Sequence, residues 1–239
     1  MAQLYLLVNL DKREKMWSFA GGSWCGGRLN EQLINRGVKP YFALSLLELD
    51  PKVVEEVQPD TLWGSWAGCR CVLIGDHCRE PLWFLTDGEE DEIERMGEDV
   101  FGWAIGTFRE AQNDPALWCP ANNEVAKLCN VNTHHVIVNI DQKEYLDPVE
   151  FGEDTCVVGF SSLRDGIMRA LFSCLFYSTI VTDVGDIPEL TWGRWAGDHL
   201  KIIEMANLPP GFEDVSREVN EELKAKLREV KDVVLYGTE

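Results

Sequence analysis

A six-residue tryptophan motif that occurs twice limits the folds open to this chain. The first copy, residues 63–68 (WGSWAG), and the second, residues 192–197 (WGRWAG), are identical at five of six positions. A second matched pair precedes them, residues 5–14 (YLLVNLDKRE) and 135–144 (HVIVNIDQKE). Two motifs that recur in the same order indicate an internal repeat.

The spacing of the two motifs is also kept. Asn9 precedes Trp66 by 57 residues, and Asn139 precedes Trp195 by 56 residues. An insertion or deletion of one residue between motifs is compatible with one structural plan used twice. We therefore expect a tandem duplication of one sheet-plus-helices unit, arranged about a pseudo-two-fold axis.

The repeat predicts two related units, which we call the first half (residues 1–112) and the second half (residues 133–239). Residues 113–132 carry Pro115, Pro120 and several asparagines, as a linker would. Each half is expected to be α+β. Local patterns predict strands at 4–10, 41–49, 69–74, 135–140, 156–160 and 200–205, and helices at 91–112, 163–178 and 214–234.

The charge balance narrows the choice of partner. The chain of 239 residues holds 41 acidic and 22 basic side chains, a net charge of −19. So acidic a surface repels nucleic acids and anionic membranes, and it favours a basic protein partner. No apolar run approaches the roughly 18 residues of a membrane span, and the N-terminus does not resemble a signal peptide. With eight scattered cysteines read as reduced thiols, a cytoplasmic location is expected.

The second half carries two stretches that resemble a known family, NIDQKEYLDPVEFG at residues 139–152 and GRWAGD at residues 193–198. An uncharacterised family of small bacterial and fungal proteins has similar stretches, Asn-Leu-Thr-Lys-Arg-Glu-Tyr-Leu-Asp-Pro and Gly-Ser-Trp-Ala-Gly-Asp. The first half departs from the pattern, because it lacks Tyr-Leu-Asp-Pro and has Cys69 in place of the last aspartate. The family has no established activity, so the resemblance implies the repeat and no chemistry.

The paired tryptophans have two interpretations. Indoles set between glycines are open to a ligand or a protein surface, which makes these side chains candidates for partner binding. Alternatively, they anchor the core of each half where its third strand begins, since large aromatic side chains dominate core energetics. The candidates are Trp63, Trp66, Trp192 and Trp195.

Acidic and basic residues at the end of the first strand of each half are candidates for proton transfer. These segments are DKRE, from Asp11, and DQKE, from Asp141. The same segments could form exposed ion pairs and a turn. Glu14 and Glu144 match between the copies, which favours a structural hydrogen-bonding role for this position. If the chain is an enzyme, the site between the halves would use Asp141, Glu144, Asp198 and His199.

Two cysteines and a His-Cys pair in the first half are candidate ligands for a zinc ion. Strand alternation puts Cys69 and Cys71 on one face, and His77 and Cys78 follow a Gly-Asp turn. The spacing differs from that of a zinc knuckle, and the second half has other residues at the matching positions. We therefore assign no metal and expect no bound cofactor.

These patterns predict a non-catalytic recognition protein that binds a protein partner, and the net charge favours a basic one, as for immunity proteins. The partner would occupy the groove between the halves or an exposed sheet face. Two alternatives stay open. One is an enzyme of unknown class with its site between the halves. The other is a self-assembling structural protein in which the last helix docks on a neighbouring chain; a homo-oligomer and a monomer with an internal pseudo-dimer are both compatible with the repeat.

Overall fold

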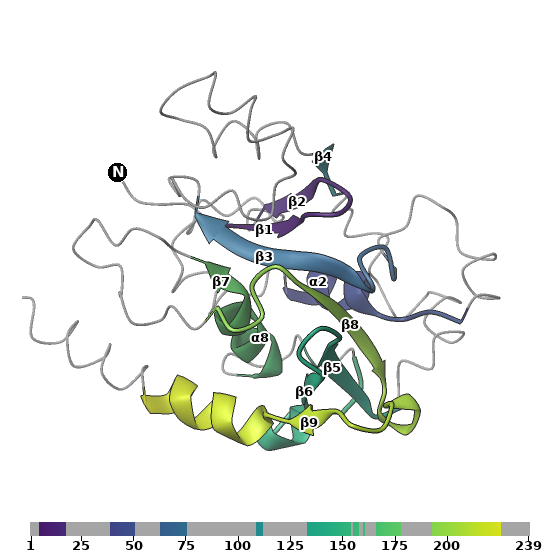
Figure 1. Ribbon diagram of the computed structural model, residues 1–239, viewed down its shortest axis with the longest axis vertical. Coiled ribbons are helices and arrows are strands. Elements are labelled where there is room, and N and C mark those ends of the chain that lie inside the picture. Colours follow the sequence, from purple (N-terminus) through teal and green to yellow (C-terminus); the bar gives the residue numbers. More distant parts are fainter. Residues whose placement is uncertain are drawn as a thin grey trace, which may run out of the picture.

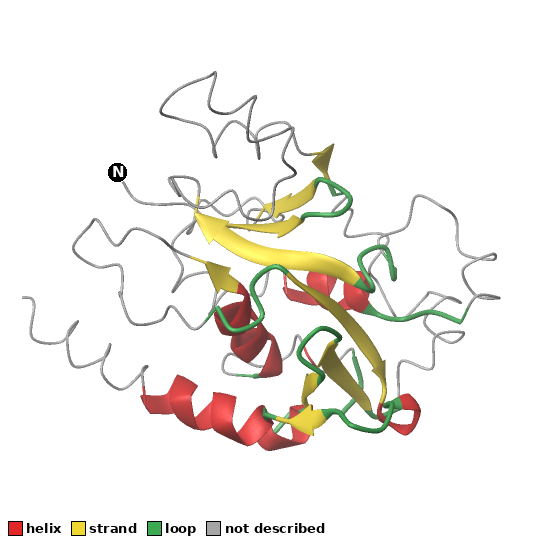
Figure 2. Ribbon diagram, viewed as in Figure 1, coloured by secondary structure: helices red, strands yellow, loops and turns green. Residues whose placement is uncertain are grey.

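The computed structural model describes residues 5–17, 39–50, 63–75, 109–111, 133–153, 155–157, 160, 166–177 and 193–225. The fold is α+β, as expected. In Figure 1 the strands form a curved ribbon from β4 to β9, and Figure 2 shows the helices beside it. The predicted linker at 113–132 lies outside the described residues.

The elements of the first half are β1 (Tyr5–Asn9), β2 (Glu14–Trp17), α2 (Lys39–Leu46), β3 (Cys69–Gly75) and β4 (Arg109–Glu110). Those of the second half are β5 (His135–Asn139), β6 (Glu144–Leu146), the 3-10 helix η2 (Pro148–Phe151), α8 (Ile167–Leu175), β7 (Phe176–Tyr177), β8 (Asp198–Glu204), the 3-10 helix η4 (Met205–Asn207) and β9 (Glu213–Asp214). A further helix covers residues 216–225.

The described strands form one nine-stranded mixed sheet in the order β4-β2-β1-β3-β8-β5-β6-β9, with β7 paired to β3. Each half begins with an antiparallel hairpin in the same register. Asn9 lies opposite Glu14 in the β1–β2 hairpin, and Asn139 lies opposite Glu144 in the β5–β6 hairpin. The third strand of each half, β3 or β8, pairs antiparallel with the first strand on its other side.

The two halves meet where β3 pairs with β8 at the centre of the sheet. The middle pair in this short antiparallel ladder is Arg70 opposite His199. The flanking pairs are Cys69 with Leu200 and Cys71 with Asp198. The sheet therefore runs from one half into the other through backbone hydrogen bonds.

Each helix that follows a hairpin leads the chain to the third strand of the opposite half. After α2, Leu47 forms a parallel bridge with Ile202 of β8, and the Glu48 backbone N–H donates to the Ile202 carbonyl at 2.8 Å. After α8, β7 runs parallel to β3, with Phe176 opposite Leu73. The two halves are consequently interlocked through these crossing segments.

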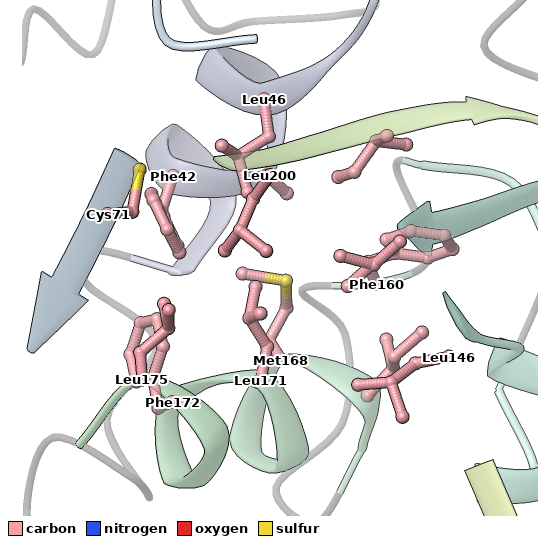
Figure 3. Packing of buried hydrophobic residues seen from close by; sticks show 14 of the residues in the cluster. Phe42, Leu46, Cys71, Leu146, Phe160, Met168, Leu171, Phe172, Leu175 and Leu200 are labelled. Atoms are coloured by element: carbon pink, nitrogen blue, oxygen red, sulfur yellow. The ribbon is translucent and has the colours of Figure 1, made fainter. Parts of the chain in front are cut away.

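Besides a small cluster of Val136, Val138 and Ile203, the described residues form a large hydrophobic core under the sheet, which draws side chains from both halves. Figure 3 shows its centre, where α2, α8, β3 and β8 meet. The labelled side chains are Phe42, Leu46, Cys71, Leu146, Phe160, Met168, Leu171, Phe172, Leu175 and Leu200. Val215, Val219 and Leu223 pack the helix at 216–225 against the same core. Among the described residues, no helix has the length and apolar character needed to cross a bilayer.

The prediction of a strand at 41–49 is wrong, because the helix α2 covers Lys39–Leu46. Residues 41–47 are all buried. A run covered on every side has no polar face, so its sequence shows neither the two-residue nor the 3.6-residue period that separates strand from helix. The helix α2 lies between the β1–β2 hairpin and the third strand, β3.

Other expected elements differ in extent. The strands expected at 4–10, 69–74, 135–140 and 200–205 are confirmed as β1, β3, β5 and β8. The helix expected at 163–178 is shorter, since α8 ends at Leu175 and the chain extends as β7. Arg109–Glu110 is a strand, not the end of a helix, and residues 155–157 are a bend and a turn. The strand β4 pairs in parallel with β2 at the edge of the sheet.

Candidate functional site

Each tryptophan motif is a tight loop held by the end of the preceding helix. The Trp66 backbone N–H donates to the Ser45 carbonyl at 2.7 Å, and the Trp195 N–H donates to the Cys174 carbonyl at 2.9 Å. Gly64 adopts a φ of 64°, and a Cβ at this position would lie 2.8 Å from a backbone oxygen just after α2. The glycine of the motif is therefore required for the close approach of loop and helix.

The loops aim both indoles at the matched glutamates. The Trp66 Nε1–H donates to Glu14 Oε2 at 2.6 Å, and the Trp195 Nε1–H donates to Glu144 Oε2 at 2.7 Å. Glu14 is buried at 5% exposure. A buried carboxylate requires such donors, because removing it from water without partners is costly. The structural hydrogen-bonding role expected for this glutamate pair is confirmed.

An arginine completes each network from a different element. Arg109 of β4 forms an ion pair with Glu14 Oε1. In the second half Arg194, inside the tryptophan motif, donates to Glu144 Oε1 at 2.7 Å and reaches Glu218 at 3.1 Å. The glutamates are thus held by two donors each and act as braces of the fold.

Three of the four motif tryptophans lie within the described residues, and all three are core side chains. Trp63 is 5% exposed, and Trp66 and Trp195 are fully buried. A buried indole cannot touch a partner at the surface, so these three residues occupy the place that the core-anchor interpretation gives them. Trp192 lies outside the described residues.

A polar cluster lies where the halves meet, and we call its four residues, Asp11, Arg70, Asp141 and His199, the central cluster. Asp11 accepts from the Arg70 backbone N–H and from its Nε–H, both at 2.7 Å. Asp141 accepts from the His199 backbone N–H at 2.7 Å and lies 2.9 Å from His199 Nδ1. The second pair repeats the first with histidine in place of arginine.

The two pairs of the central cluster are neighbours, since Arg70 and His199 are cross-strand partners. His199 Nε2 lies 4.0 Å from Asp11 Oδ2, so the imidazole stands between two carboxylates. The four side chains are 32–40% exposed. Sequence reasoning identified Asp141 and His199 and missed Arg70, although superposing the two motif copies places Arg70 at the position of His199.

Opposing effects act on the two aspartates. Partial burial tends to raise the pKa of Asp11, but hydrogen bonds and the charge of Arg70 outweigh it, and the pKa lies below its usual value. Partial burial also tends to raise the pKa of Asp141. The hydrogen bonds from His199 outweigh this effect, and the pKa of Asp141 lies below its usual value. Both carboxylates are therefore held in their charged form at neutral pH.

We expect the stabilisation from these aspartates to vanish in acid. An aspartate whose pKa is lowered by folding stabilises the protein above its unfolded pKa of about 3.9, and this contribution is lost as the pH falls through the folded value. The variant Asp11→Asn/Asp141→Asn should lose up to about 2 kcal/mol at pH 7, as two exposed pairs allow. Urea midpoints at neutral and acidic pH measure this; a gap to the wild type that persists at about pH 2 would contradict it.

The four residues of the enzyme alternative do not converge. Consecutive residues of a strand point to opposite faces, which separates Asp198 from His199. Asp198 Oδ2 accepts from Asn139 Nδ2 at 2.8 Å, and Glu144 is engaged by Trp195. Only Asp141 and His199 are in contact, and they belong to the central cluster.

The zinc candidates are only partly within the described residues. Cys71 is buried and Cys69 is partly exposed, while His77 and Cys78 lie outside the described part. Burial raises the pKa of the Cys71 thiol well above its usual value. Within the described residues no three His, Cys, Asp or Glu side chains are grouped so as to hold a metal ion.

Comparison of the chain with protein-family models, with curated proteins and with solved structures gave no match. The resemblance of the second half to a family of small proteins therefore stays a prediction.

Proposed function

We propose that this chain is a non-catalytic recognition protein that binds a basic protein partner through the exposed face of its last described helix. The net charge of −19 supports this proposal, because it attracts a basic surface and accelerates the encounter. The joint between the halves offers less support for the groove expected from the sequence, since β3 and β8 pair there over a shared core.

The observation that carries the proposal is the orientation of the helix at 216–225. Val215, Val219 and Leu223 are buried in the core with Ser216 and Asn220 beside them, so that positions 217, 218, 221, 222 and 224 are exposed. The exposed acidic residues of the segment 213–225, which comprises β9 and this helix, are called the acidic strip: Glu213, Asp214, Glu218, Glu221 and Glu222. Two basic residues, Arg217 and Lys224, leave the segment with a net charge of −3.

The central cluster favours a structural role over catalysis. Asp141–His199 resembles a base oriented by a carboxylate, but Asp11–Arg70 occupies the matching place in the first half. An arginine stays protonated at neutral pH and cannot act as a general base. What the two pairs share is the anchoring of a hairpin turn to the adjacent strand.

The self-assembly alternative is also weakened by burial. Docking of the last helix on a neighbouring chain would use its apolar face, and the described part of that face already packs inside this molecule. The exposed face is polar and acidic, which suits a charged partner better than a second copy of the same acidic chain.

The experiment compares two charge-swapped variants. Glu221→Lys/Glu222→Lys alters the acidic strip, and Glu48→Lys/Asp50→Lys alters exposed residues after α2; each moves the net charge from −19 to −15. With a basic protein retained by the wild type from lysate, the strip variant should lower the association rate constant about tenfold at about 50 mM salt, and the control much less.

Salt supplies the second arm of this experiment. The wild-type association rate constant should fall steeply between about 50 and about 300 mM salt, because screening shortens the reach of the charges. An association rate indifferent to salt, or one reduced equally by both charge swaps, would contradict the proposal.

We also infer that the chain is a tandem duplication arranged about a pseudo-two-fold axis. The matching hairpin registers, the central Arg70–His199 pair and the paired indole-to-glutamate hydrogen bonds support this inference. So do the positive φ values of Arg13 and Lys143 at the same place in the two turns.

The duplication predicts how the second half behaves by itself. Residues 133–239 expressed alone should form a homodimer, because a second copy of β8 can replace β3 and a second α8 can replace α2. Size-exclusion chromatography with light scattering measures the mass, and circular dichroism verifies the fold. A folded monomer would contradict the inference.

A further inference from the structure

Asn139 uses its whole side-chain amide. Its Oδ1 accepts from the backbone N–H groups of Asp141 and Gln142, both at 3.0 Å, which holds the turn between β5 and β6. Its Nδ2 donates to Asp198 Oδ2 at 2.8 Å. A fully buried amide is thereby satisfied at both ends.

Asn9 stands at the same place in the first half and lacks the second of these bonds. It is fully buried, and its Oδ1 accepts from the Lys12 backbone N–H at 2.9 Å. Its Nδ2 has no hydrogen-bond partner among the described residues. A buried donor left without an acceptor is uncommon and unfavourable.

The missing acceptor corresponds to Cys69. The Cys69 backbone N–H donates to the Trp66 carbonyl at 3.0 Å, as the Asp198 N–H donates to the Trp195 carbonyl at 3.1 Å. Asn9 pairs with the residue two positions after Cys69, just as Asn139 pairs with the residue two positions after Asp198. By these matching registers, Cys69 stands relative to Asn9 where Asp198 stands relative to Asn139, and the turn holds Oδ1 of the asparagine in both halves.

We propose that Cys69 is an oxidation site at which hydrogen peroxide converts the thiol to a sulfinate that accepts the hydrogen bond from Asn9 Nδ2. A sulfinate has two oxygens and one negative charge, like the carboxylate of Asp198. Oxidation therefore gives the first half the interaction that the second half has by sequence.

The reaction uses two molecules of peroxide. In the first step the Cys69 sulfur attacks a peroxide oxygen, an S–O bond forms, the O–O bond breaks, and the thiol proton leaves with the departing hydroxide as water. The sulfenic acid repeats this step with a second peroxide to give the sulfinate, one more water and a released proton. Sulfur loses four electrons in total, and the two peroxides are reduced by two each.

Exposure directs the oxidant to Cys69 in preference to its buried neighbours. Cys69 and Cys156 are partly exposed, whereas Cys71 and Cys174 are buried. Burial raises the pKa of the Cys174 thiol to about 12 and that of Cys71 well above its usual value, so neither forms the reactive thiolate at neutral pH. Cys156 serves as an exposed comparison.

The test treats the intact chain with graded hydrogen peroxide and maps the cysteines by peptide mass spectrometry. Cys69 should gain two oxygens while Cys71 and Cys174 remain thiols, and the Tm should rise by roughly 5 °C as the charged hydrogen bond forms. Cys69→Ser should abolish the peroxide-dependent rise in Tm, and Cys156→Ser should retain it.

A genetic mimic provides an arm that needs no oxidant. Cys69→Asp should melt above both the wild type and Cys69→Ser by a similar amount, because its carboxylate reproduces the acceptor. The proposal is overturned if Cys69 stays a thiol at a peroxide concentration that oxidises Cys156. It is equally overturned if oxidised Cys69 leaves the Tm unchanged or lower, or if Cys69→Asp melts no higher than Cys69→Ser.

Discussion

Replacing Trp66 with alanine is expected to lower the free energy of unfolding by about 3–5 kcal/mol. The indole is fully buried, and its ring meets Phe42 edge-on with centroids 6.0 Å apart. Alanine would leave a cavity under the sheet. It would also remove the donor at 2.6 Å from Glu14, whose buried carboxylate would keep the ion pair with Arg109.

Two further variants separate the causes of this loss. Trp66→Phe keeps most of the apolar volume and removes the N–H donor together with part of the ring, so it should cost about 1–3 kcal/mol. Val149→Ala alters a side chain that is 54% exposed and should change the stability by no more than about 0.5 kcal/mol. Urea midpoints followed by far-ultraviolet circular dichroism measure all three without relying on tryptophan emission.

The same variants distinguish the two interpretations of the tryptophan motif. A surface contact for a partner would let Trp66→Ala fold with an unchanged urea midpoint. That result would contradict the core-anchor role, whereas a large loss of stability would follow from it.

The sequence predicted the strands best where the two halves match. Residues 69–74, 135–140 and 200–205 hold the β-branched and aliphatic side chains of a sheet covered on both faces, and the observed strands begin within two residues of these bounds. The match of Glu14 with Glu144 also indicated a structural role, because it is the carboxylate that is kept while the residues before it change.

Contacts between the halves could not be predicted in the same way. Nothing in the local pattern of 69–74 indicates that this strand pairs with β8. Strand pairing depends on which other strand has an unpaired edge nearby, and the local sequence does not contain that information. The helix α2 could not be predicted, because residues 41–47 are buried on every side and therefore show no helical period of polar and apolar residues. The central cluster combines Arg70 with His199, which are 129 positions apart, and only the pairing of β3 with β8 brings them together.

The second prediction with a large effect follows from the shared core. A destabilising substitution in one half should lower the stability of both halves equally. Phe172 of α8 is fully buried and meets Phe42 of α2, with ring centroids 5.8 Å apart. Phe172→Ala should cost about 3–5 kcal/mol. Because the core and the sheet are continuous between the halves, that loss should apply to the whole molecule as one cooperative unit.

Thiol labelling at increasing urea concentrations measures the unfolding of each half separately. Cys71 of β3 reports on the first half and Cys174 of α8 on the second, and both are buried in the native state. In Phe172→Ala both thiols should become reactive at the same lowered urea concentration, and in the control Val149→Ala both should keep the wild-type midpoint. Two independently folded units joined by a linker would respond differently: Cys174 would shift, and Cys71 would keep its midpoint. The interlocking of β7 with β3 and of Leu47 with β8 makes that separation unfavourable, because neither half completes its sheet without a segment from the other.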